Sequence, residues 1–522
     1  MSDQEDLFDD MEADAAAGMT GKKSEPEFFE NDESAPTFFE EVSAPIDMSH
    51  VVWKDYPVKG KPKPHQMLAL HEAAEKGPHA FILDPGAGKT FTCIAEAGRL
   101  YQCGKIDGMI VTAPNGVHIQ WIEDEFPKWA DFDWHGMWHR QSKTASKAFR
   151  EGYQSKFGVL AINYEGLGTE KARASIEDFI KKYPRYYIAI DESQKIKNFK
   201  AAVTKNVEAL AGGASYRRIL SGTPILKGLE DLFSQYFILK AGITGPFATK
   251  TMAANYYGLR NYYCELAPVP GRQNSHAAQI VGYRNEQEFR DRIRPFTTRV
   301  KSDQFMAGER PDFMTVQSPM TDVQRRAYAT MKTMLLSDIE GGRITAQNAL
   351  VQLGKLLQIA SGFIYDEEKG AQWISNNKIN AIMNILEDLD EPTIIWTPFI
   401  PLRKAISEAL EAAGVQSYVL TNQTQINLWK ENGGVAVANQ GSGAGVGQNY
   451  QHCAANIYAA NTFSSEARWQ SEKRTDRMGQ LRQVRYWDIT TPNSVDLKAL
   501  RALRDKKAIS VDNIDVLREM AL

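Results

Sequence analysis

The sequence predicts an α/β fold with two separate parallel sheets. Three observations support this prediction. The 522 residues exceed the roughly 100–200 of one domain, and the apolar (43%) and charged (24%) fractions are those of a globular protein. Short apolar runs alternate with helical patterns, which is typical of parallel α/β layers. The apolar runs also fall into two sets, with long helical patterns over residues 230–390 between them.

The apolar runs define the expected strands. The first set comprises residues 80–83, 108–112, 158–162, 186–190 and 218–220. The second set comprises residues 393–396, 416–420, 434–438, 456–460 and 484–489. Helical periodicity predicts helices over 91–100, 322–339 and 346–360. We therefore expect a first domain over 51–300 with a helical insertion near 235–300, and a second over 301–522 with a helical protrusion near 319–372.

The first 50 residues differ in charge from the rest of the chain. They hold fifteen Asp and Glu but only two Lys, a net charge of −13, so the remaining residues carry +9 of the total of −4. High charge with few β-branched residues predicts a disordered acidic tail. A mildly basic body is compatible with a nucleic-acid partner, and equally with an ordinary solvated surface.

Other sequence features restrict the cellular setting. No stretch approaches the roughly 18 unbroken apolar residues of a membrane span, and the acidic start is unlike a secretory signal peptide. The four cysteines are scattered without a C-x-x-C pair, at Cys93, Cys103, Cys264 and Cys453. We therefore expect no membrane partner, no disulfide framework and a reducing cytoplasm.

A glycine-rich loop follows the first expected strand. Pro85-Gly86-Ala87-Gly88-Lys89-Thr90 lies between that strand and a helical pattern. Glycines allow backbone N–H groups to surround phosphate oxygens, and the start of a helix adds a favourable dipole. Lys89 would reach the β- and γ-phosphates, and Thr90 would bind Mg²⁺. Leu83 stands where the full phosphate-loop pattern has a glycine, and the alternative is a turn that happens to end in Lys-Thr.

An acidic pair follows another expected strand, about a hundred residues further on. Asp191 and Glu192 come directly after the apolar run 186–190. Adjacent carboxylates at a strand end suit metal-assisted hydrolysis, because one can hold Mg²⁺ while the other orients and deprotonates water. A solvated turn is the alternative for such a pair in isolation. The shared α/β unit with the phosphate loop favours the catalytic interpretation.

Several further segments have the residues and spacing of known motifs. In the first half these are His65-Gln66, Val111–Pro114 with Trp121, Glu125 and Trp129, Asp191–Asn198, and Leu220–Ile225. In the second half they are Arg299–Asp303, the Gln324…Tyr328 spacing, Gly443–Tyr450 and Gln470–Gln480. These segments resemble those of Swi/Snf-type DNA translocases of helicase superfamily two, particularly compact bacterial or phage-like members. The resemblance runs from about Lys59 to Asp496. Gln194 in place of His, Lys227 and Gly228 near the usual Gln-Asn, and Ala444 in place of Gly depart from the family pattern.

This resemblance implies two RecA-like lobes with ATP and Mg²⁺ bound in a cleft between them. The cofactor-binding residues would be Gln66, which reads adenine, with Gly86, Gly88, Lys89 and Thr90. The metal would lie on Thr90 and Asp191, and Gln470, Arg474 and Arg477 would join Lys89, Asp191 and Glu192 in catalysis. Because Arg474 and Arg477 are three residues apart, we expect both on one helical face, reaching toward the γ-phosphate.

The resemblance also implies residues that couple ATP use to DNA. Ser221, Gly222 and Thr223 would transmit the nucleotide state, while Gly445, Gly447 and Asn449 would contact phosphates without reading bases. The leading hypothesis is a monomeric DNA-dependent ATPase that translocates on duplex or branched DNA in a bacterial or phage-infected cytoplasm. A strand-separating or annealing helicase acting on forks is the alternative. A nucleotide-switch scaffold is the non-enzymatic alternative, although Glu192, Arg474 and Arg477 are all present.

The acidic tail contains a further short motif. Gln4-Glu5-Asp6-Leu7-Phe8 resembles the peptide that bacterial sliding clamps capture. Leu7 and Phe8 would fill an apolar pocket of the clamp, and Gln4 would make polar contacts at its rim. Two other interpretations remain open: a DNA mimic that folds over the basic cleft and restrains the ATPase, and a solubilising tail.

Overall fold

A computed structural model describes most of the chain beyond the acidic tail. The described residues are 48–49, 51, 55–139, 156–225, 228–240, 256–268, 278–304, 311–341, 343–366, 370–440, 448–477, 479–504 and 514–522. The predictions for the tail, and for its residues Gln4, Leu7 and Phe8, lie outside these residues. The coupling residues Gly445 and Gly447 also lie outside them.

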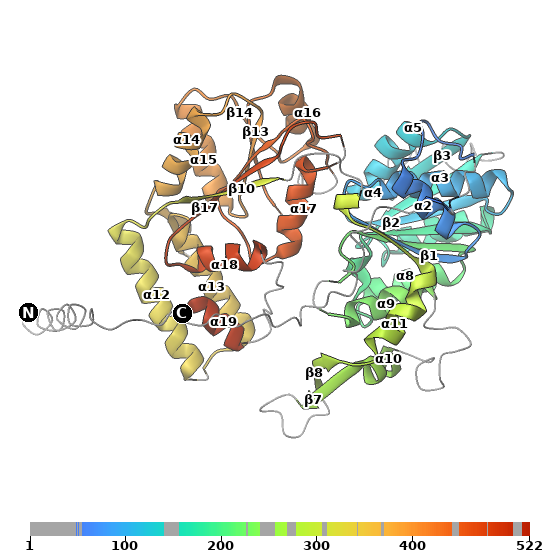
Figure 1. Cartoon of the computed structure of the whole chain (residues 1–522), viewed down its shortest axis with the longest axis horizontal. Coiled ribbons are helices and arrows are strands. Elements are labelled where there is room, and N and C mark those ends of the chain that lie inside the picture. The colour runs from blue at the N-terminus through green and yellow to red at the C-terminus, as the bar shows by residue number, and fades with distance from the viewer. Residues whose placement is uncertain are drawn as a thin grey trace, which may run out of the picture. The chain divides into compact units, whose positions relative to one another are not determined.

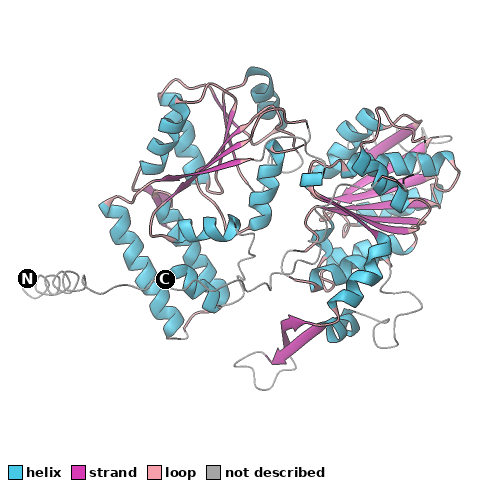
Figure 2. Cartoon of the chain, viewed as in Figure 1, coloured by secondary structure: helices cyan, strands magenta, loops and turns pink. Residues whose placement is uncertain are grey.

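The first sheet has seven parallel strands in the order β3-β4-β2-β5-β6-β1-β9 (Figures 1 and 2). The strands are β1 (Pro78–Leu83), β2 (Gly108–Ala113), β3 (Trp134–Trp138), β4 (Phe157–Asn163), β5 (Tyr186–Asp191), β6 (Tyr216–Ser221) and β9 (Thr297–Val300). All five strands predicted for the first set are confirmed. The sheet also contains β3 and β9, which lie at its two edges and were not predicted.

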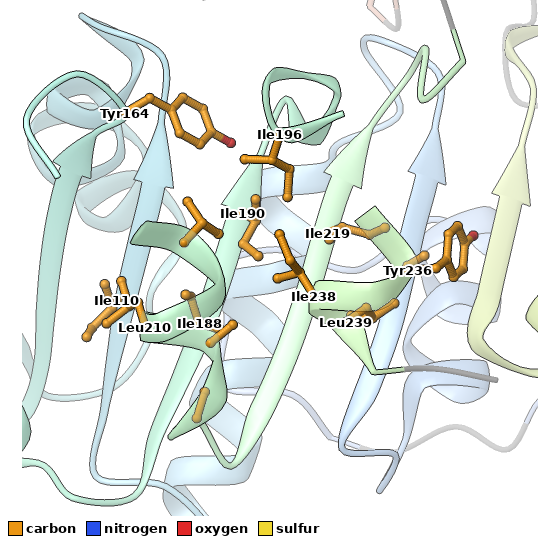
Figure 3. Close-up of a cluster of buried hydrophobic side chains, with 14 of the residues drawn as sticks. Ile110, Tyr164, Ile188, Ile190, Ile196, Leu210, Ile219, Tyr236, Ile238 and Leu239 are labelled. Carbon is orange, nitrogen blue, oxygen red and sulfur yellow. The ribbon is translucent and has the colours of Figure 1, made fainter. Parts of the chain in front are cut away.

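Strict alternation of side chains gives this sheet two apolar faces. Along β1, Ala80 and Ile82 join one buried cluster, whereas Phe81 and Leu83 join the other. Figure 3 shows the first cluster, where Ile188 of β5 lies beside Leu210 of helix α8 (Ala202–Gly212), and Ile219 of β6 lies beside Ile238 of helix α9 (Glu230–Leu239). A strand buried on both faces reads as a continuous apolar run, which explains why these strands were visible in the sequence.

Helices cover both faces of the first sheet (Figure 1). On the face of Phe81 lie α2 (Pro64–Ala73), α3 (Lys89–Gln102), and a helical stretch made of α4 (Val117–Gln120), a π-helical segment (Trp121–Glu125) and α5 (Phe126–Trp129). On the face of Ile82 lie α7 (Glu170–Lys182), α8 (Ala202–Gly212), α9 (Glu230–Leu239), α10 (Tyr256–Tyr263) and α11 (Glu286–Ile293). Short 3₁₀ turns cover Ser193–Ile196, Arg294–Phe296 and Ser302–Gln304.

The second sheet has six parallel strands in the order β10-β17-β16-β13-β15-β14. They are β10 (Asp312–Gln317), β13 (Thr393–Trp396), β14 (Ser417–Val419), β15 (Val435–Ala438), β16 (Ala455–Tyr458) and β17 (Arg485–Thr490). All five strands predicted for the second set are confirmed. Its edge strand β10 was not predicted. Two parallel sheets with helices between their strands confirm the predicted α/β fold.

The helices of the second part form two groups. Those beside the sheet are α14 (Asn377–Glu387), α15 (Ile400–Ala412), α16 (Gln423–Asn432), α17 (Ser465–Thr475) and α18 (Val495–Arg504). The predicted helices 322–339 and 346–360 are confirmed as α12 (Asp322–Glu340) and α13 (Ala346–Ala360), which share a separate apolar cluster with α19 (Ile514–Ala521). In the described residues, no helix is long and apolar enough to cross a membrane.

Two small hairpins lie outside the main sheets. One is β7 (Cys264–Pro268) with β8 (Ala278–Tyr283), and the other is β11 (Phe363–Asp366) with β12 (Gly370–Trp373). The first lies within the region where we expected a helical insertion, residues 235–300. That region therefore combines helices α10 and α11 with a hairpin, and it ends in β9, a strand of the main sheet.

Candidate nucleotide and coupling site

The sequence-predicted residues of the first sheet lie at the carboxyl ends of neighbouring strands. The glycine-rich loop follows β1, Asp191 ends β5, and Ser221 ends β6. In the sheet order β5 and β1 both flank β6, so the three segments are adjacent. The carboxyl edge of a parallel sheet is where α/β proteins bind ligands.

The glycine-rich loop has the backbone geometry of an anion cradle. Gly86 and Gly88 have φ angles of 85° and 83°, in the left-handed region that favours glycine. Gly88 is the N-cap of α3 and makes no side-chain capping bond. The first N–H groups of a helix have no partner within it, so those of α3 are available to phosphate oxygens. Lys89 Nζ donates to the Leu83 carbonyl oxygen at 3.0 Å, which folds its side chain over the loop.

Two side chains of α2 contact the backbone of this loop. His65 Nε2 and Gln66 Nε2 lie 2.9 Å and 3.0 Å from the Ala87 carbonyl oxygen. Burial lowers the pKa of His65. A Cβ atom added to Gly88 would lie 2.3 Å from Gln66 Nε2, so a side chain there would displace Gln66 as well as strain the left-handed backbone.

Both the oxygen and the nitrogen of the Gln66 side-chain amide form hydrogen bonds within the protein. Its Oε1 accepts from the Lys63 backbone N–H at 2.9 Å, while its Nε2 donates to Ala87. A carboxamide has two donor hydrogens and two lone pairs, so half of its capacity remains for a base. The contact with the loop is a role that the sequence did not predict.

The loop is also tied to the last strand of the sheet. The Asp84 carboxylate accepts from Arg299 Nη1 and from the Ser302 backbone N–H, each at 2.8 Å. Asp84 N–H in turn donates to the Val300 carbonyl oxygen at 3.0 Å. The residues before the glycines are therefore fixed to the chain that leaves the first sheet.

Asp191 is a buried carboxylate held by an indole. Trp121 Nε1 donates to Asp191 Oδ2 at 3.0 Å, and the Tyr164 hydroxyl donates to the Asp191 carbonyl oxygen at 2.6 Å. Burial, and then the charge of Glu192, raise the pKa of Asp191 to about 6; the Trp121 bond and the charge of Lys89 act in the opposite direction. The effect of Lys89 indicates that the phosphate loop and the acidic pair act on one electrostatic site.

Glu192 begins a hydrogen-bonded chain toward β6. Its φ angle of 51° is left-handed, a strained conformation for a non-glycine residue, and such strain is common at functional sites. Gln194 Nε2 donates to Glu192 Oε2 at 2.8 Å, and Gln194 Oε1 accepts from Ser221 Oγ at 2.8 Å. Ser221 Oγ accepts from the Thr223 N–H at 3.1 Å. The acidic pair and the Ser221-Gly222-Thr223 segment are thus directly connected.

The expectation that Arg474 and Arg477 share one helical face is wrong. Helix α17 ends at Thr475, and Asp476 leaves the helical conformation with φ −83° and ψ 83°, so Arg477 lies beyond the helix. Different carboxylates act to raise the pKa of the two arginines. Burial lowers the pKa of Arg474 to about 10, and the Glu192 charge opposes this shift. Burial also lowers the pKa of Arg477, and there Glu125 opposes it.

The other predicted residues of the second part have local partners. Arg474 Nη1 donates to the Gln448 carbonyl oxygen at 3.3 Å, and its buried Nε has no hydrogen-bond partner among the described residues. Gln470 Nε2 donates to Glu466 Oε1 at 3.0 Å, within α17. Asn449 Oδ1 accepts from the Gln451 N–H at 3.1 Å.

The residues present fit a nucleotide with Mg²⁺. The uncapped start of α3, the lysine folded over it and the unpartnered Nε of Arg474 all suit a polyanion. Within the described ranges no group of three His, Cys, Asp or Glu side chains could hold a metal ion. Mg²⁺ does not require one, because it is usually held by one or two protein oxygens together with phosphates and water. Thr90 and Asp191 supply ligands of that type.

A parallel α/β sheet with a phosphate-type loop and an acidic pair at the ends of two strands that flank a third defines the class of nucleotide-binding α/β proteins. Comparisons with known proteins identify the family. Residues 67–360 match the model of the SNF2-related domain. The chain therefore belongs to the SNF2-related family, which confirms the family resemblance expected from the sequence.

Individual relatives differ in how much of their length they share with this chain. An uncharacterized ATP-dependent helicase of Bacillus subtilis is 22% identical over 477 residues, which are 85% of this chain and 78% of the relative. A probable ATP-dependent DNA helicase of Arabidopsis thaliana is 32% identical over 155 residues, 28% of this chain and only 13% of the relative. The Sulfolobus solfataricus SWI2/SNF2 ATPase core in complex with double-stranded DNA is 22% identical, with coverage of 90% and 96% and a TM-score of 0.39.

Proposed function

We propose that this protein is a DNA-dependent ATPase that uses Mg²⁺ and ATP to translocate along duplex DNA. The observation that carries the proposal is the unbroken connection from the acidic pair to Ser221 and Thr223 through Gln194. Such a connection suits a motor, because a displacement of Glu192 would also displace the residues at the end of β6. Membership of the family supports the DNA substrate, and a DNA motor of bacterial type would work in the cytoplasm.

The nucleotide-binding roles follow from the geometry. The N–H groups at the start of α3 would bind phosphate oxygens, and Lys89 would exchange its bond to Leu83 for one to the β- and γ-phosphates. Thr90 and Asp191 would hold Mg²⁺, which when bound neutralises phosphate charge. Because Asp191 is buried, its electrostatic interaction with Mg²⁺ would be stronger than in water.

The catalytic roles fall to the acidic pair and to the second part of the chain. Glu192 would orient and deprotonate the attacking water, because its Oε2 is held by Gln194. Arg474 would stabilise transition-state charge, since the Glu192 charge already acts on its guanidinium. Ser221 and Thr223 would pass the state of this site to the surface that binds the DNA backbone.

Substitutions at the site test the nucleotide roles. We expect Lys89→Ala and Glu192→Gln each to abolish steady-state ATP turnover, with no more than a few degrees of change in melting temperature, since neither side chain belongs to the apolar core. The control is Lys105→Ala, which removes an exposed ion pair with Glu75 of 3.7 Å. Turnover at the wild-type level in either site variant would contradict the assignment.

A DNA profile tests the substrate. ATPase rates with single-stranded, duplex and forked DNA of equal length would be compared, followed by displacement of a third strand from duplex DNA and by unwinding of a fork. We expect stimulation by duplex DNA and third-strand displacement. Stimulation by single strands alone together with fork unwinding would favour the strand-separating helicase instead. An ATPase that no DNA stimulates would refute the proposal.

A further inference from the structure

A buried polar cluster lies at the carboxyl ends of β15, β16 and β17, and we call it the Arg468 cluster. Its members are Gln440, Asn461, Arg468, Glu472 and Asp488. Arg468 Nη1 donates to Asn461 Oδ1 at 3.0 Å and to Asp488 Oδ1, and Nη2 donates to Asp488 Oδ2 at 3.2 Å. Its Nε donates to Glu472 Oε1 at 2.6 Å. Gln440 Nε2 completes the cluster by donating to Asn461 Oδ1 at 3.2 Å.

Four of the five members are almost completely removed from water, whereas the Glu472 side chain is 18% exposed. Asp488 is 0% exposed, Asn461 1%, Gln440 3% and Arg468 5%. The Arg468 guanidinium also lies 3.4 Å above the ring of Tyr458 in β16. All three nitrogens of the guanidinium are therefore bonded, and one of its faces is stacked. A planar fork held in this way has a single orientation.

Stability alone does not account for such a cluster. Burying a carboxylate and a guanidinium costs several kcal/mol of desolvation per ion, and well-packed apolar side chains of equal volume often give the same or greater stability. What the bidentate pair does provide is a fixed direction for the helix that carries Arg468. That helix is α17, which also carries Gln470 and Arg474.

The same helix is linked to described residues that follow β15 and to others that precede β16. After β15, Gln440 is linked to Arg468 through Asn461. Before β16, the Gln448 carbonyl accepts from Arg474 at 3.3 Å, and the Tyr450 N–H donates to the Arg474 carbonyl at 2.9 Å. Helix α17 is therefore linked to Gln440, and bonded to Gln448 and Tyr450, at points six residues apart along the helix.

We propose that Arg468 is a positioning residue that couples DNA binding near Asn449 to the placement of Arg474. The inference rests on the proposed function, because it needs both a DNA contact near Asn449 and a catalytic Arg474. A movement of Asn449 on DNA would act on Arg474 through the bonds of Gln448 and Tyr450, and the Arg468 cluster would make α17 move as one body.

The experiment compares wild type with Arg468→Met, which preserves much of the side-chain volume but removes the fork. The readout is the ratio of the ATPase rate with saturating duplex DNA to the rate without DNA, because loss of folded protein lowers both rates equally and leaves the ratio unchanged. We expect this ratio to fall about tenfold or more, within the range of typical coupling energies. The KM for ATP and the affinity for DNA should stay within about twofold of wild type.

Arg468→Lys is the second variant, since it keeps the charge but not the bidentate geometry. We expect it to lower the ratio as well, and it keeps the test decisive if Arg468→Met does not fold. The matched control is Lys378→Met. Lys378 forms another buried ion pair of this region, 2.7 Å from Asp496 and only 3% exposed, but its bonds go to Asp496, Ala459 and Ile489 rather than to α17.

The outcomes separate the inference from the proposed function. A stimulation ratio unchanged in folded Arg468→Met or Arg468→Lys would overturn the inference while leaving the proposed function intact. An equal loss in Lys378→Met would also overturn it, because any buried charge would then have the same effect. A wild-type protein that DNA does not stimulate would refute the proposed function, and the inference with it.

Discussion

Trp121 shows how one side chain can hold a buried carboxylate. Its indole N–H bonds to Asp191 inside the protein, where an ionised carboxylate is otherwise costly. Trp121 is also the first residue of the π-helical segment, an irregularity that is frequent at functional sites. The sequence marked Trp121 only as part of a resemblance, because nothing local reveals a partner seventy residues away.

Replacing Trp121 by Phe tests this contact. The bond favours the ionised form, so its loss should raise the pKa of Asp191 above its value of about 6. A hydrogen bond to a charged group is worth roughly 1.5–3 kcal/mol, so we expect turnover to fall about tenfold at pH 6.5 and much less at pH 8.5. Steady-state assays at both pH values would measure this. Trp138→Phe, which removes an exposed bond to Glu123, is the control; equal losses at both pH values would contradict the argument.

His452 provides a pH dependence of stability. Burial, and then the charges of Lys430 and Arg482, lower the pKa of His452 to about 4. The unfolded chain, with a histidine pKa of about 6.5, therefore binds more protons than the folded chain between pH 4 and 6.5. The stabilising contribution is complete above pH 6.5 and is lost as the pH falls toward 4.

The variant His452→Asn should flatten this dependence. We expect the free energy of unfolding, measured by urea titration, to decrease less between pH 7 and pH 5 than it does in wild type. The reason is that the variant has no imidazole to protonate in the unfolded state. An identical decrease in both proteins would show that His452 does not titrate as described.

At the scale of elements, the sequence predicted best the strands that are buried on both faces. Runs such as Ile188–Ile190 are apolar at every position, and both faces of their sheet are covered. The missed strands β3, β9 and β10 are edge strands with mixed residues, such as Trp134–Trp138 and Asp312–Gln317. Their pairing depends on distant neighbours, so no local pattern distinguishes them from loops.

The site shows the same division. The positions of the glycine-rich loop and of the acidic pair could be predicted because each is a local motif at the end of an apolar strand. The contacts of Gln66 with Ala87, and of Arg468 with Asp488, join residues about 20 apart on different elements, and no spacing encodes them. The end of α17 was also missed, since a repeat of three residues is compatible with a helix that stops between the two arginines.

The end of α17 leads to different expectations for its two arginines. Arg474 is subject to the Glu192 charge, whereas Arg477 is subject to that of Glu125. We expect Arg474→Ala to bind ATP normally but to lose roughly 10³-fold in turnover, as arginine fingers do. Arg477→Ala should also bind ATP, with a smaller loss that Glu125→Gln reproduces. Nucleotide-binding titrations and turnover assays measure both; loss of ATP binding in Arg474→Ala would contradict its proposed role.

At the scale of the whole molecule, the first 50 residues carry a net charge opposite to that of the rest of the chain. Their net charge of −13 opposes the +9 of the rest of the chain. If the tail acts as a DNA mimic, its deletion should raise DNA-independent ATPase activity or tighten DNA binding, with a steeper dependence on salt. ATPase assays and DNA titrations at two salt concentrations would measure this.

If the tail instead captures a sliding clamp, deletion should leave these properties unchanged and abolish clamp binding. Leu7→Ala with Phe8→Ala should then have the same effect as the deletion, because these two side chains carry the apolar contact. A pull-down with a bacterial clamp provides the measurement. Truncated and double-alanine proteins that match wild type in every assay would leave only a solubilising role.

The position of β1 in its sheet has a consequence for how the protein is made. β1 is the first of the described strands to be synthesised, yet its two neighbours are β6 and β9, which begin at residues 216 and 297. At roughly 5–20 residues per second, the nascent strand waits roughly 7–30 s for β6 and longer for β9. During that interval Phe81, Ile82 and Leu83, which are fully buried in the finished protein, have no sheet to join. Biosynthesis therefore exposes the segment next to the phosphate loop to aggregation, and a chaperone that shields nascent apolar chain would act there first.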